Sequence, residues 1–402
     1  MINKQYSDLS QTLTNKIDKT IKKKQGIYFT PPKTINKNLQ LLEPYIKDIK
    51  NVLEPSCGSC EFILALQKKY HYLDITAIEL NETIYESISK SINNTRLLHL
   101  DFLEYNETVG YDLIIGNPPY VVIKKEKKLS IYSKYYDGRP NLFILFILKS
   151  LTLLNENGIL SFILPKNFLN CLYYDKTRRF IYNNYKIINI IHCKDSYLET
   201  SQETILLILQ KSKDIFNNEM YSFVKYPYTI FGTIENIQIL KSLYQNSTSL
   251  YNLNCKVNIG TIVWNQCKKI LTDDMTKTRL IYSSNIKNNS LVIQNYKNNE
   301  KKNYIDKKGS NQPTIVVNRG YGIGHYKFEY CFIQGDFEYL IENHLITIQP
   351  ISIMKKNELE NFFKKIIQSF QNPKTQKFIQ YYFQNNSINS NELCYILPIY
   401  DI

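Results

Sequence analysis

The sequence predicts an α/β protein with a doubly wound, mostly parallel sheet, followed by a second domain of mixed α+β structure. From residue 51 to about residue 210, short apolar runs alternate with helix-like segments, which is the rhythm of a parallel sheet covered by helices. After about residue 211 the segments become shorter and richer in Asn, Ser, Lys and Tyr. The length of 402 residues also fits two or three domains of roughly 150 residues each.

Each element of the first domain follows from its local pattern. Strands are expected where short runs are mostly apolar. These runs are 51–54, 74–79, 96–100, 111–115, 158–164, 187–191 and 204–209. Helices are expected at 61–69, 82–93 and 141–154, and a later one at 357–370 ends before Pro373.

The domain boundary is expected near residue 240, giving domains of residues 1–240 and 241–402. No Pro- or Gly-rich linker marks this point, but the strand and helix alternation has ended there. Residues 1–25 are predicted to form an amphipathic helix, because apolar residues recur every fourth position from residue 9 to residue 21. This segment lacks the apolar stretch of a signal peptide.

The charge indicates an anionic partner. Fifty Lys and Arg against 36 Asp and Glu give a net charge of +14, which favours nucleic acid or a membrane surface. The net charge is +6 for residues 1–50, −1 for residues 51–150 and +7 for residues 251–402. A general Lys-rich bias would distribute the charge more evenly, so both ends of the chain are candidate contact regions.

The composition indicates a globular cytoplasmic protein. Hydrophobic residues make up 43% of the chain, enough for a sizeable core. The longest apolar runs, 142–148 and 205–209, are far shorter than the roughly 18 residues needed to span a bilayer. Eight scattered Cys fit a reducing compartment better than secretion. We expect a cytoplasmic monomer without membrane contact.

Acidic residues recur at the ends of three successive predicted strands. Glu54 precedes a small-residue turn, Glu79 ends the second strand, and Asp101-Phe102 follows the third. At the carboxyl ends of parallel strands, a carboxylate suits ribose hydroxyls, and Asp101-Phe102 suits the amino group and ring of an adenine. A single acid there would more often be a solvated strand end. The turn lacks the fingerprints of NAD-binding and ATP-binding loops.

Cys57-x-x-Cys60 lies in the turn after the first strand and admits other interpretations. Such a pair near a βαβ pattern can be a redox site. Zinc is disfavoured because no second Cys pair or spaced His pair completes four ligands. We therefore expect no metal.

The fourth strand leads into Gly116-Asn117-Pro118-Pro119-Tyr120, the most specific signal in the chain. Two consecutive prolines remove two backbone donors, so this loop offers carbonyl oxygens, and Asn117 adds an amide oxygen. Two acceptors beside an aromatic face are suited to gripping a planar amino group. A proline-stiffened turn alone would explain Pro-Pro, but not this position after the fourth strand.

Taken in order, these residues resemble the gamma-class N6-adenine-specific DNA methyltransferases, the Taq-type enzymes with a C-terminal target-recognition domain. The resemblance covers about residues 20–210. The stretch from Gly26 to Pro32 looks like the segment that closes over the cofactor, and Asn117 to Tyr120 looks like the catalytic tetrapeptide. Tyr197 falls where the family has a second base-stacking aromatic, usually Phe. Cys60 departs from the pattern and has no assigned role.

The resemblance implies the class I S-adenosylmethionine-dependent methyltransferase fold and S-adenosylmethionine as cofactor. The catalytic residues that it implies are Asn117, Pro118, Pro119, Tyr120 and Tyr197. The implied cofactor-binding residues are Tyr28, Thr30, Glu54, Ser56, Cys57, Gly58, Glu79, Leu80, Asp101, Phe102 and Asn117. The implied reaction extrudes an adenine from duplex DNA and transfers a methyl group to its N6. The Asn117 side-chain oxygen and the Pro118 carbonyl would accept the two N6 hydrogens.

The second domain is expected to recognise the DNA target. Its candidate contacts are Arg279, Asn318, Arg319, Tyr321 and Lys327, although a single Arg or Lys there is more often a phosphate contact or a solvated residue. Two other functions remain open: a methyltransferase for protein glutamine or rRNA guanine, and a non-catalytic specificity module. A separate restriction endonuclease partner and an orphan enzyme fit the sequence equally.

Overall fold

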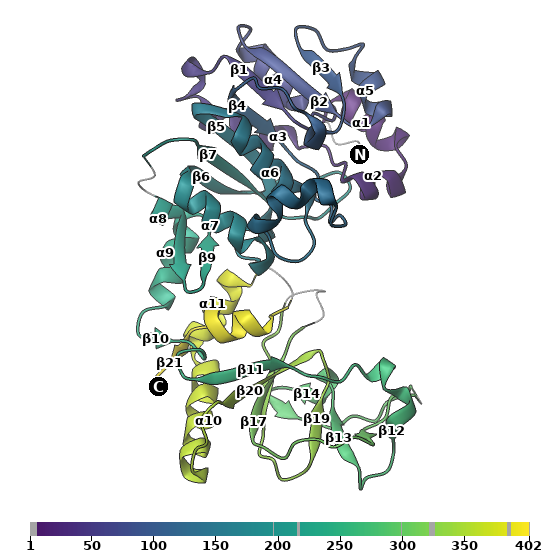
Figure 1. The fold of residues 1–402 in the computed structure, drawn as a ribbon, viewed down its shortest axis with the longest axis vertical. Coiled ribbons are helices and arrows are strands. Elements are labelled where there is room, and N and C mark those ends of the chain that lie inside the picture. Colours follow the sequence, from purple (N-terminus) through teal and green to yellow (C-terminus); the bar gives the residue numbers. More distant parts are fainter. Residues whose placement is uncertain are drawn as a thin grey trace. The chain divides into compact units, whose positions relative to one another are not determined.

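The structure, a computed structural model, describes residues 6–195, 197–214, 218–298, 300–320, 326–383 and 387–401. These residues divide into two compact units (Figure 1). Unit 1 contains the described residues up to Val224 together with Tyr228–Ile237, and unit 2 contains Lys225–Pro227 and the described residues from Gln238 onward.

Unit 1 is built around a seven-stranded sheet with the order β3-β2-β1-β4-β5-β7-β6. Neighbouring strands from β3 to β5 run parallel, and β7 runs antiparallel to both β5 and β6. The strands are β1 (Asn51–Glu54), β2 (Asp74–Glu79), β3 (Arg96–His99), β4 (Tyr111–Gly116), β5 (Leu154–Pro165), β6 (Lys186–Cys193) and β7 (Thr204–Gln210).

The winding direction of the sheet reverses between β1 and β4. From β1 the chain adds β2 and β3 on one side, and then continues with β4 and β5 on the other. In such sheets, ligands bind outside the carboxyl ends of the strands at the point of reversal. The loops after Glu54 and Gly116 flank this point.

Helices cover both faces of the sheet. Leu53 and Ile114 pack with α6 and α7 on one face, whereas their neighbours Val52 and Leu113 pack with α3, α4 and α5 on the other. Successive strand residues point to opposite faces, so each strand contributes to both cores. The helices are α3 (Pro32–Leu42), α4 (Glu61–Lys69), α5 (Glu82–Ile88), α6 (Leu142–Leu153) and α7 (Asp175–Asn184).

The N-terminal segment forms two helices where one was expected. They are α1 (Asp8–Lys16) and α2 (Lys19–Gln25). Ile17 is extended and buried, and Asp18 starts the second helix by accepting a hydrogen bond from the backbone N–H of Thr20. The break occurs because an Asp side chain stabilises a helix start better than a helix interior. Ile21, expected on the apolar face, is exposed.

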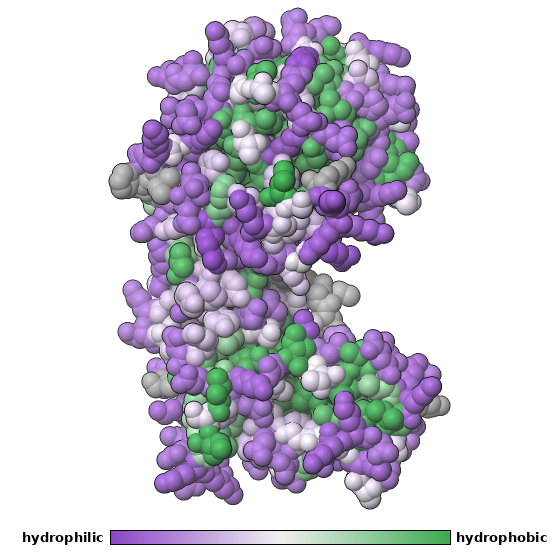
Figure 2. Space-filling view, viewed as in Figure 1, coloured by the Kyte–Doolittle hydropathy of each residue, from purple (hydrophilic) through white to green (hydrophobic). Residues whose placement is uncertain are grey.

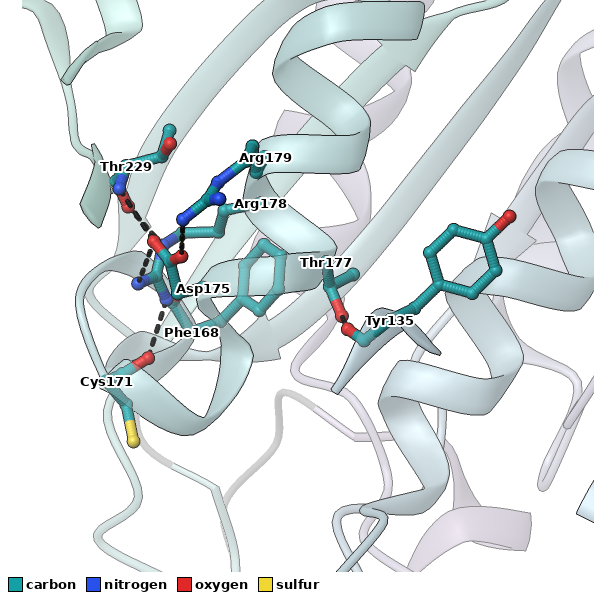
Figure 3. Close-up of polar contacts among 8 residues, drawn as sticks. All are labelled: Tyr135, Phe168, Cys171, Asp175, Thr177, Arg178, Arg179 and Thr229. Atoms are coloured by element: carbon teal, nitrogen blue, oxygen red, sulfur yellow. Dashed lines mark hydrogen bonds and ion pairs between the residues drawn. The ribbon is translucent and has the colours of Figure 1, made fainter. Parts of the chain in front are cut away.

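A buried charged network anchors α7 to the end of unit 1 (Figure 3). The guanidinium of Arg178, whose exposed fraction is 0%, donates to the carbonyl oxygens of Phe168, Cys171 and Thr229 at 2.6 to 2.9 Å. The Asp175 carboxylate accepts from the Thr229 N–H at 2.6 Å and lies 3.8 Å from Arg178. Thr229 belongs to β9 (Tyr228–Phe231), so this network fastens the last strands of unit 1 onto the sheet domain.

The remaining elements of unit 1 are short. They are α8 (Asn218–Tyr221) and a two-stranded ribbon of β8 (Ser222–Lys225) and β9. Helix α9 (Ile234–Leu243) begins in unit 1 and ends in unit 2.

Unit 2 contains two four-stranded sheets of mostly antiparallel strands. Their orders are β11-β20-β17-β18 and β12-β16-β13-β19. The strands are β11 (Cys255–Ile259), β12 (Leu271–Thr272), β13 (Thr278–Ile281), β16 (Tyr304–Ile305), β17 (Thr314–Asn318), β18 (Tyr330–Ile333), β19 (Tyr339–Ile341) and β20 (Leu345–Pro350). Two small ribbons pair β14 (Ile286–Lys287) with β15 (Ser290–Leu291) and β10 (Ser247–Thr248) with β21 (Ile399–Tyr400).

Two helices complete unit 2, α10 (Lys356–Gln371) and α11 (Pro373–Tyr382). Phe363 and Phe370, seven residues apart on one face of α10, pack against the rings of Phe332 and Tyr330. Helix α10 therefore docks on β18, and the expected helix at 357–370 agrees with it within one residue at each end.

Candidate active site

The predicted site residues converge at the carboxyl edge of the parallel strands. Glu54 and Glu79 end β1 and β2, Asp101 follows β3, and Asn117 follows β4. A cavity of about 210 Å³ opens here. Its lining residues are Lys24, Gln25, Gly26, Ile27, Tyr28, Phe29, Pro55, Ser56, Gly58, Glu79, Leu80, Asn81, Ile84, Leu100, Asp101, Phe102, Asn117, Pro119, Leu142 and Phe146.

Most of the predicted cofactor residues line this cavity, namely Tyr28, Ser56, Gly58, Glu79, Leu80, Asp101, Phe102 and Asn117. Thr30, Glu54 and Cys57 are also buried but do not line this cavity. We call this space the first cavity.

The turn after β1 is held by Glu79. Gly58, in the left-handed conformation, donates its backbone N–H to Glu79 Oε2 at 2.9 Å, and Asn81 donates its N–H to Oε1 at 2.7 Å. These bonds fix the carboxylate at the cavity wall. Burial raises the pKa of Glu79, while the backbone donors act in the opposite direction. The wall thus presents carboxylate oxygens that can accept further hydrogen bonds.

Asp101 and Phe102 form the next part of the wall. Asp101 Oδ1 accepts from the N–H of Leu103 at 2.9 Å, and the buried Phe102 ring packs against Phe146 with ring centroids 4.8 Å apart. The Lys149 ammonium lies 5.3 Å from the centre of the Phe102 ring and donates to the Leu103 carbonyl at 2.8 Å. An aromatic face next to a carboxylate can hold a planar ring with an amino group.

Glu54 carries a buried carboxyl group. Among the described residues its Oε2 has no hydrogen-bond partner. Burial, followed by the nearby Cys60 and Glu79, raises its pKa well above the usual value. The protonated form is thus favoured in the folded protein.

Replacing Glu54 with Gln is expected to stabilise the ligand-free protein more as the pH rises from 5 to 8. In the unfolded chain a Glu ionises near pH 4.3, whereas the folded protein retains its proton, so wild-type stability falls with pH above that value. Gln carries no such dependence. Thermal unfolding of both proteins across this range tests the prediction. A constant difference between them would contradict it.

Asn117 connects the loop after β4 to the N-terminal segment. Its Nδ2 donates to Thr30 Oγ1 at 3.1 Å and to the Tyr28 carbonyl at 3.3 Å. A carbonyl oxygen can only accept, so this contact fixes which end of the amide is the donor. The Tyr120 hydroxyl lies 2.7 Å from Asn117 Oδ1 and 3.0 Å from the Ile163 carbonyl, both acceptors for its single proton.

A second cavity of about 330 Å³ lies on the other side of this loop. Gly26 and Tyr28 line both cavities, so they form a common wall. The second cavity is lined by Lys23, Gly26, Tyr28, Tyr120, Val121, Val122, Tyr197, Thr200, Gln202 and Thr204. Tyr197 is 8% exposed, and burial raises its pKa above the ordinary value.

Several residues that line the cavities were not predicted from the sequence. Lys23, Val121, Thr200 and Gln202 line the second cavity but carry no recognisable motif. Gly26 has a clearer signal, because a glycine that closes a Lys-rich helix predicts a left-handed C-cap, and Gly26 has φ +70°.

In unit 2, the predicted DNA contacts lie on two different sheets. Arg279 is on β13, where its guanidinium packs 5.1 Å from the Phe337 ring centre and donates to the Tyr304 hydroxyl at 2.8 Å. Asn318 ends β17 in the other sheet, and Arg319 follows it and donates to the Asn343 carbonyl at 3.0 Å. Lys327 is ion-paired with Glu329. Tyr321 lies outside the described residues.

Within the described part of the chain, no cluster of three or more His, Cys, Asp or Glu side chains could hold a metal ion. Cys57 and Cys60 are both free and buried. No described helix has the length and apolar character that crossing a membrane requires. On the face drawn in Figure 2, hydrophilic residues surround scattered apolar patches in both units.

Sequence comparison relates the chain to restriction-modification methylases. The family described as Eco57I restriction-modification methylase matches residues 60–198. The modification methylase CviBIII of Paramecium bursaria Chlorella virus NC1A is 26% identical over 356 residues, which cover 86% of this chain and 88% of that protein. The chain is a relative of such methyltransferases.

Two further comparisons cover part of the chain. The type II methyltransferase M.AccI of Acinetobacter calcoaceticus is 30% identical over 190 residues, which cover 43% of this chain and 35% of that protein. A crystal structure of the M protein of the type I restriction enzyme EcoKI has a TM-score of 0.36 and 16% identity, covering 46% of this chain and 44% of that one.

The fold and cofactor predictions are confirmed. The sheet, with its single antiparallel strand β7 between β5 and β6, has the strand order of class I S-adenosylmethionine-dependent methyltransferases. The similarity to modification methylases makes S-adenosylmethionine the cofactor. The first cavity fits it, because apolar rings and two carboxylates suit an adenosine with its hydroxyl and amino donors. When bound, this cofactor supplies a methyl group on a positively charged sulfur.

Proposed function

We propose that the protein is a site-specific DNA methyltransferase that methylates N6 of a flipped-out adenine in duplex DNA. The observation that carries the proposal is the position of the Asn117-Pro118-Pro119-Tyr120 loop between two adjoining cavities. Asn117 and Pro119 line the first cavity, and Tyr120 lines the second. A base in the second cavity would have its amino group beside the loop that borders the cofactor.

The loop residues can activate an exocyclic amino group without a general base. We assign the Asn117 Oδ1 and Pro118 carbonyl oxygens as acceptors of the two N6 hydrogens. Accepting both hydrogens draws the nitrogen toward tetrahedral geometry and exposes its lone pair. Positioning and preorganised acceptors then supply most of the catalysis.

The Tyr120 hydroxyl can leave Asn117 Oδ1 free for an incoming amino group by rotation of its proton alone. Its proton can go to Asn117 Oδ1 or to the Ile163 carbonyl. When an amino group occupies Asn117 Oδ1, the hydroxyl proton turns to Ile163, and the Tyr120 ring keeps its orientation for stacking. Stacking on an aromatic ring contributes roughly 1 to 3 kcal/mol per base. We assign Tyr197 as the second aromatic wall of this cavity.

Basic residues and relatives support DNA as the substrate. Lys23 lines the second cavity, and Lys124 and Lys125 are exposed shortly after Tyr120. The net charge of +7 over residues 251–402 suits phosphate binding by unit 2, which we propose as the target-recognition domain. The relatives described above include type II methyltransferases. A monomeric state and a separate restriction endonuclease remain predictions.

The test is incubation of the protein with duplex DNA and labelled S-adenosylmethionine, followed by mapping of N6-methyladenine at single-base resolution. We expect label at adenines within one short sequence. Label only in protein or rRNA, or on cytosine, would overturn the proposal.

Replacing Gly26 with Ala is expected to lower both cofactor affinity and methyl transfer. A Cβ at Gly26 would lie 2.8 Å from Val121 Cγ2 and 2.9 Å from Pro119 Cβ, so the wall between the cavities must shift. Gly138→Ala is the control, because Gly138 has a similar φ of +67° but only side-chain neighbours at 3.4 Å.

Calorimetric titration of S-adenosylmethionine and transfer kinetics measure the two effects. Both glycine variants carry a similar backbone strain of roughly 1 to 2 kcal/mol, since both positions are left-handed. Equal activity of the two variants would show that crowding at the wall is unimportant.

A further inference from the structure

We propose that an ion pair between the buried Lys22 and the more exposed Glu199 positions the loop that carries Tyr197 at the second cavity. We define the Tyr197 loop as residues 194–195 and 197–203. The inference rests on the proposed function, since it assigns this loop a part in holding the flipped base. Lys22 and Glu199 act as positioning residues, because neither lines a cavity.

The Lys22 ammonium is fully engaged. Lys22 is 3% exposed, and its Nζ donates to both carboxylate oxygens of Glu199 at 2.6 and 2.7 Å and to the Thr14 carbonyl at 2.6 Å. An ammonium has three protons, and each has an acceptor here. Such geometry compensates for burying the Lys22 charge, whereas loss of Glu199, whose own side chain is 25% exposed, leaves that charge buried without its counter-charge.

Three consecutive lysines of α2 face three different surroundings. Lys22 is buried against Glu199, Lys23 lines the second cavity, and Lys24 lines the first cavity. Each residue of a helix is turned by about 100° from the one before, which separates these directions. The ion pair therefore fixes the rotation of the helical turn that serves both cavities.

The Tyr197 loop is fastened to the N-terminal part of the chain at two further points. Thr34 Oγ1 of α3 donates to Asp195 Oδ2 at 2.8 Å, and Tyr6 bonds to the backbone of Leu198. Glu199 lies between Tyr197 and Thr200, both of which line the second cavity. Release of Glu199 would therefore displace two residues of that wall.

The ion pair is tested with Glu199→Gln and Lys22→Met, and with Lys22→Arg as the conservative variant. Lys19→Met is the control, because Lys19 is an exposed lysine of the same helix. The measurements are transfer kinetics on duplex DNA, fluorescence of 2-aminopurine at the target position, and S-adenosylmethionine affinity.

Both disrupting variants are expected to lower kcat/KM for duplex DNA by about 10- to 100-fold, since small misplacements of reacting groups have effects of this size. The fluorescence of 2-aminopurine at the flipped position should decrease together with kcat/KM. Cofactor affinity should stay within about 2-fold, and Lys22→Arg should restore most of the activity. Unchanged fluorescence and kcat/KM, or a loss of cofactor affinity of equal size, would overturn the inference.

Hydrogen exchange separates failure of this inference from failure of the proposed function. In the absence of DNA, the amides of residues 197–203 should exchange faster in Glu199→Gln than in the wild type. Unchanged exchange would refute the ion pair's role whatever the substrate. If instead the wild-type protein methylates no DNA, the proposed function is wrong, and the exchange result still decides whether the pair holds the loop.

Discussion

Replacing Asn117 with Ala should lower methyl transfer by about a thousandfold, the largest effect on activity that we expect. The side chain would lose the Oδ1 acceptor for the amino group and the two Nδ2 contacts that orient it toward Thr30 and Tyr28. Removal of one preorganised hydrogen-bonding group at a reacting centre costs about 10² to 10³ in kcat. Loss of the orienting contacts adds to this.

Cofactor affinity should change only a few-fold in Asn117→Ala, because many other residues line the first cavity. Single-turnover kinetics and calorimetric titration separate the two quantities. Asn184→Ala is the matched control, since Asn184 is an exposed asparagine of α7 whose amide donates to the Phe180 carbonyl at 2.8 Å. Retained transfer in Asn117→Ala would refute its assigned role, and lost cofactor binding would show that the residue serves the cofactor.

Replacing Arg178 with Met should produce the largest loss of stability, about 3 to 5 kcal/mol in the free energy of unfolding. The change removes the donor to three buried carbonyl oxygens and leaves the Asp175 carboxylate, 3% exposed, without its buried cationic neighbour. Buried carbonyl oxygens left without a donor cannot recover their hydration, so the folded state bears the full cost.

Arg179→Met provides a matched control for this prediction. Arg179 pairs with the same Asp175 at 2.7 Å, but its side chain is 51% exposed, so its removal should cost less than about 1 kcal/mol. Denaturant unfolding of both variants measures the difference. Similar losses in the two would show that burial of the Arg178 network contributes little.

Local sequence patterns were sufficient to predict the strands of the central sheet and the positions of the motifs at their ends. An apolar run that ends in Glu54 or Glu79 marks both a strand and the polar residue at its end. The Asn117 loop was predicted in the same way, from the polar residue and the two prolines that follow an apolar run. Helix ends were predicted less well. Helix α5 ends at Ile88 rather than at the expected residue 93, because the Ser89 and Ser91 hydroxyls bond to preceding carbonyls.

The second cavity could not be predicted from local patterns. Its wall joins Gly26, Tyr120 and Tyr197, which come together only when the N-terminal segment folds across the sheet edge. Arg279 and Asn318 are a converse case. Their chemistry suggested a shared DNA-contact surface, but they lie on different sheets.

The sequence by itself determined the α/β class and the residues that end the strands, because each depends on neighbours within a few positions. Its resemblance to a known family indicated the cofactor. The tertiary structure decided which distant side chains meet. Lys22 and Glu199 are 177 residues apart, and nothing in either segment indicates the other. A buried charge finds its partner only through the packing of the whole chain, since the cost of desolvation appears when surrounding elements exclude water.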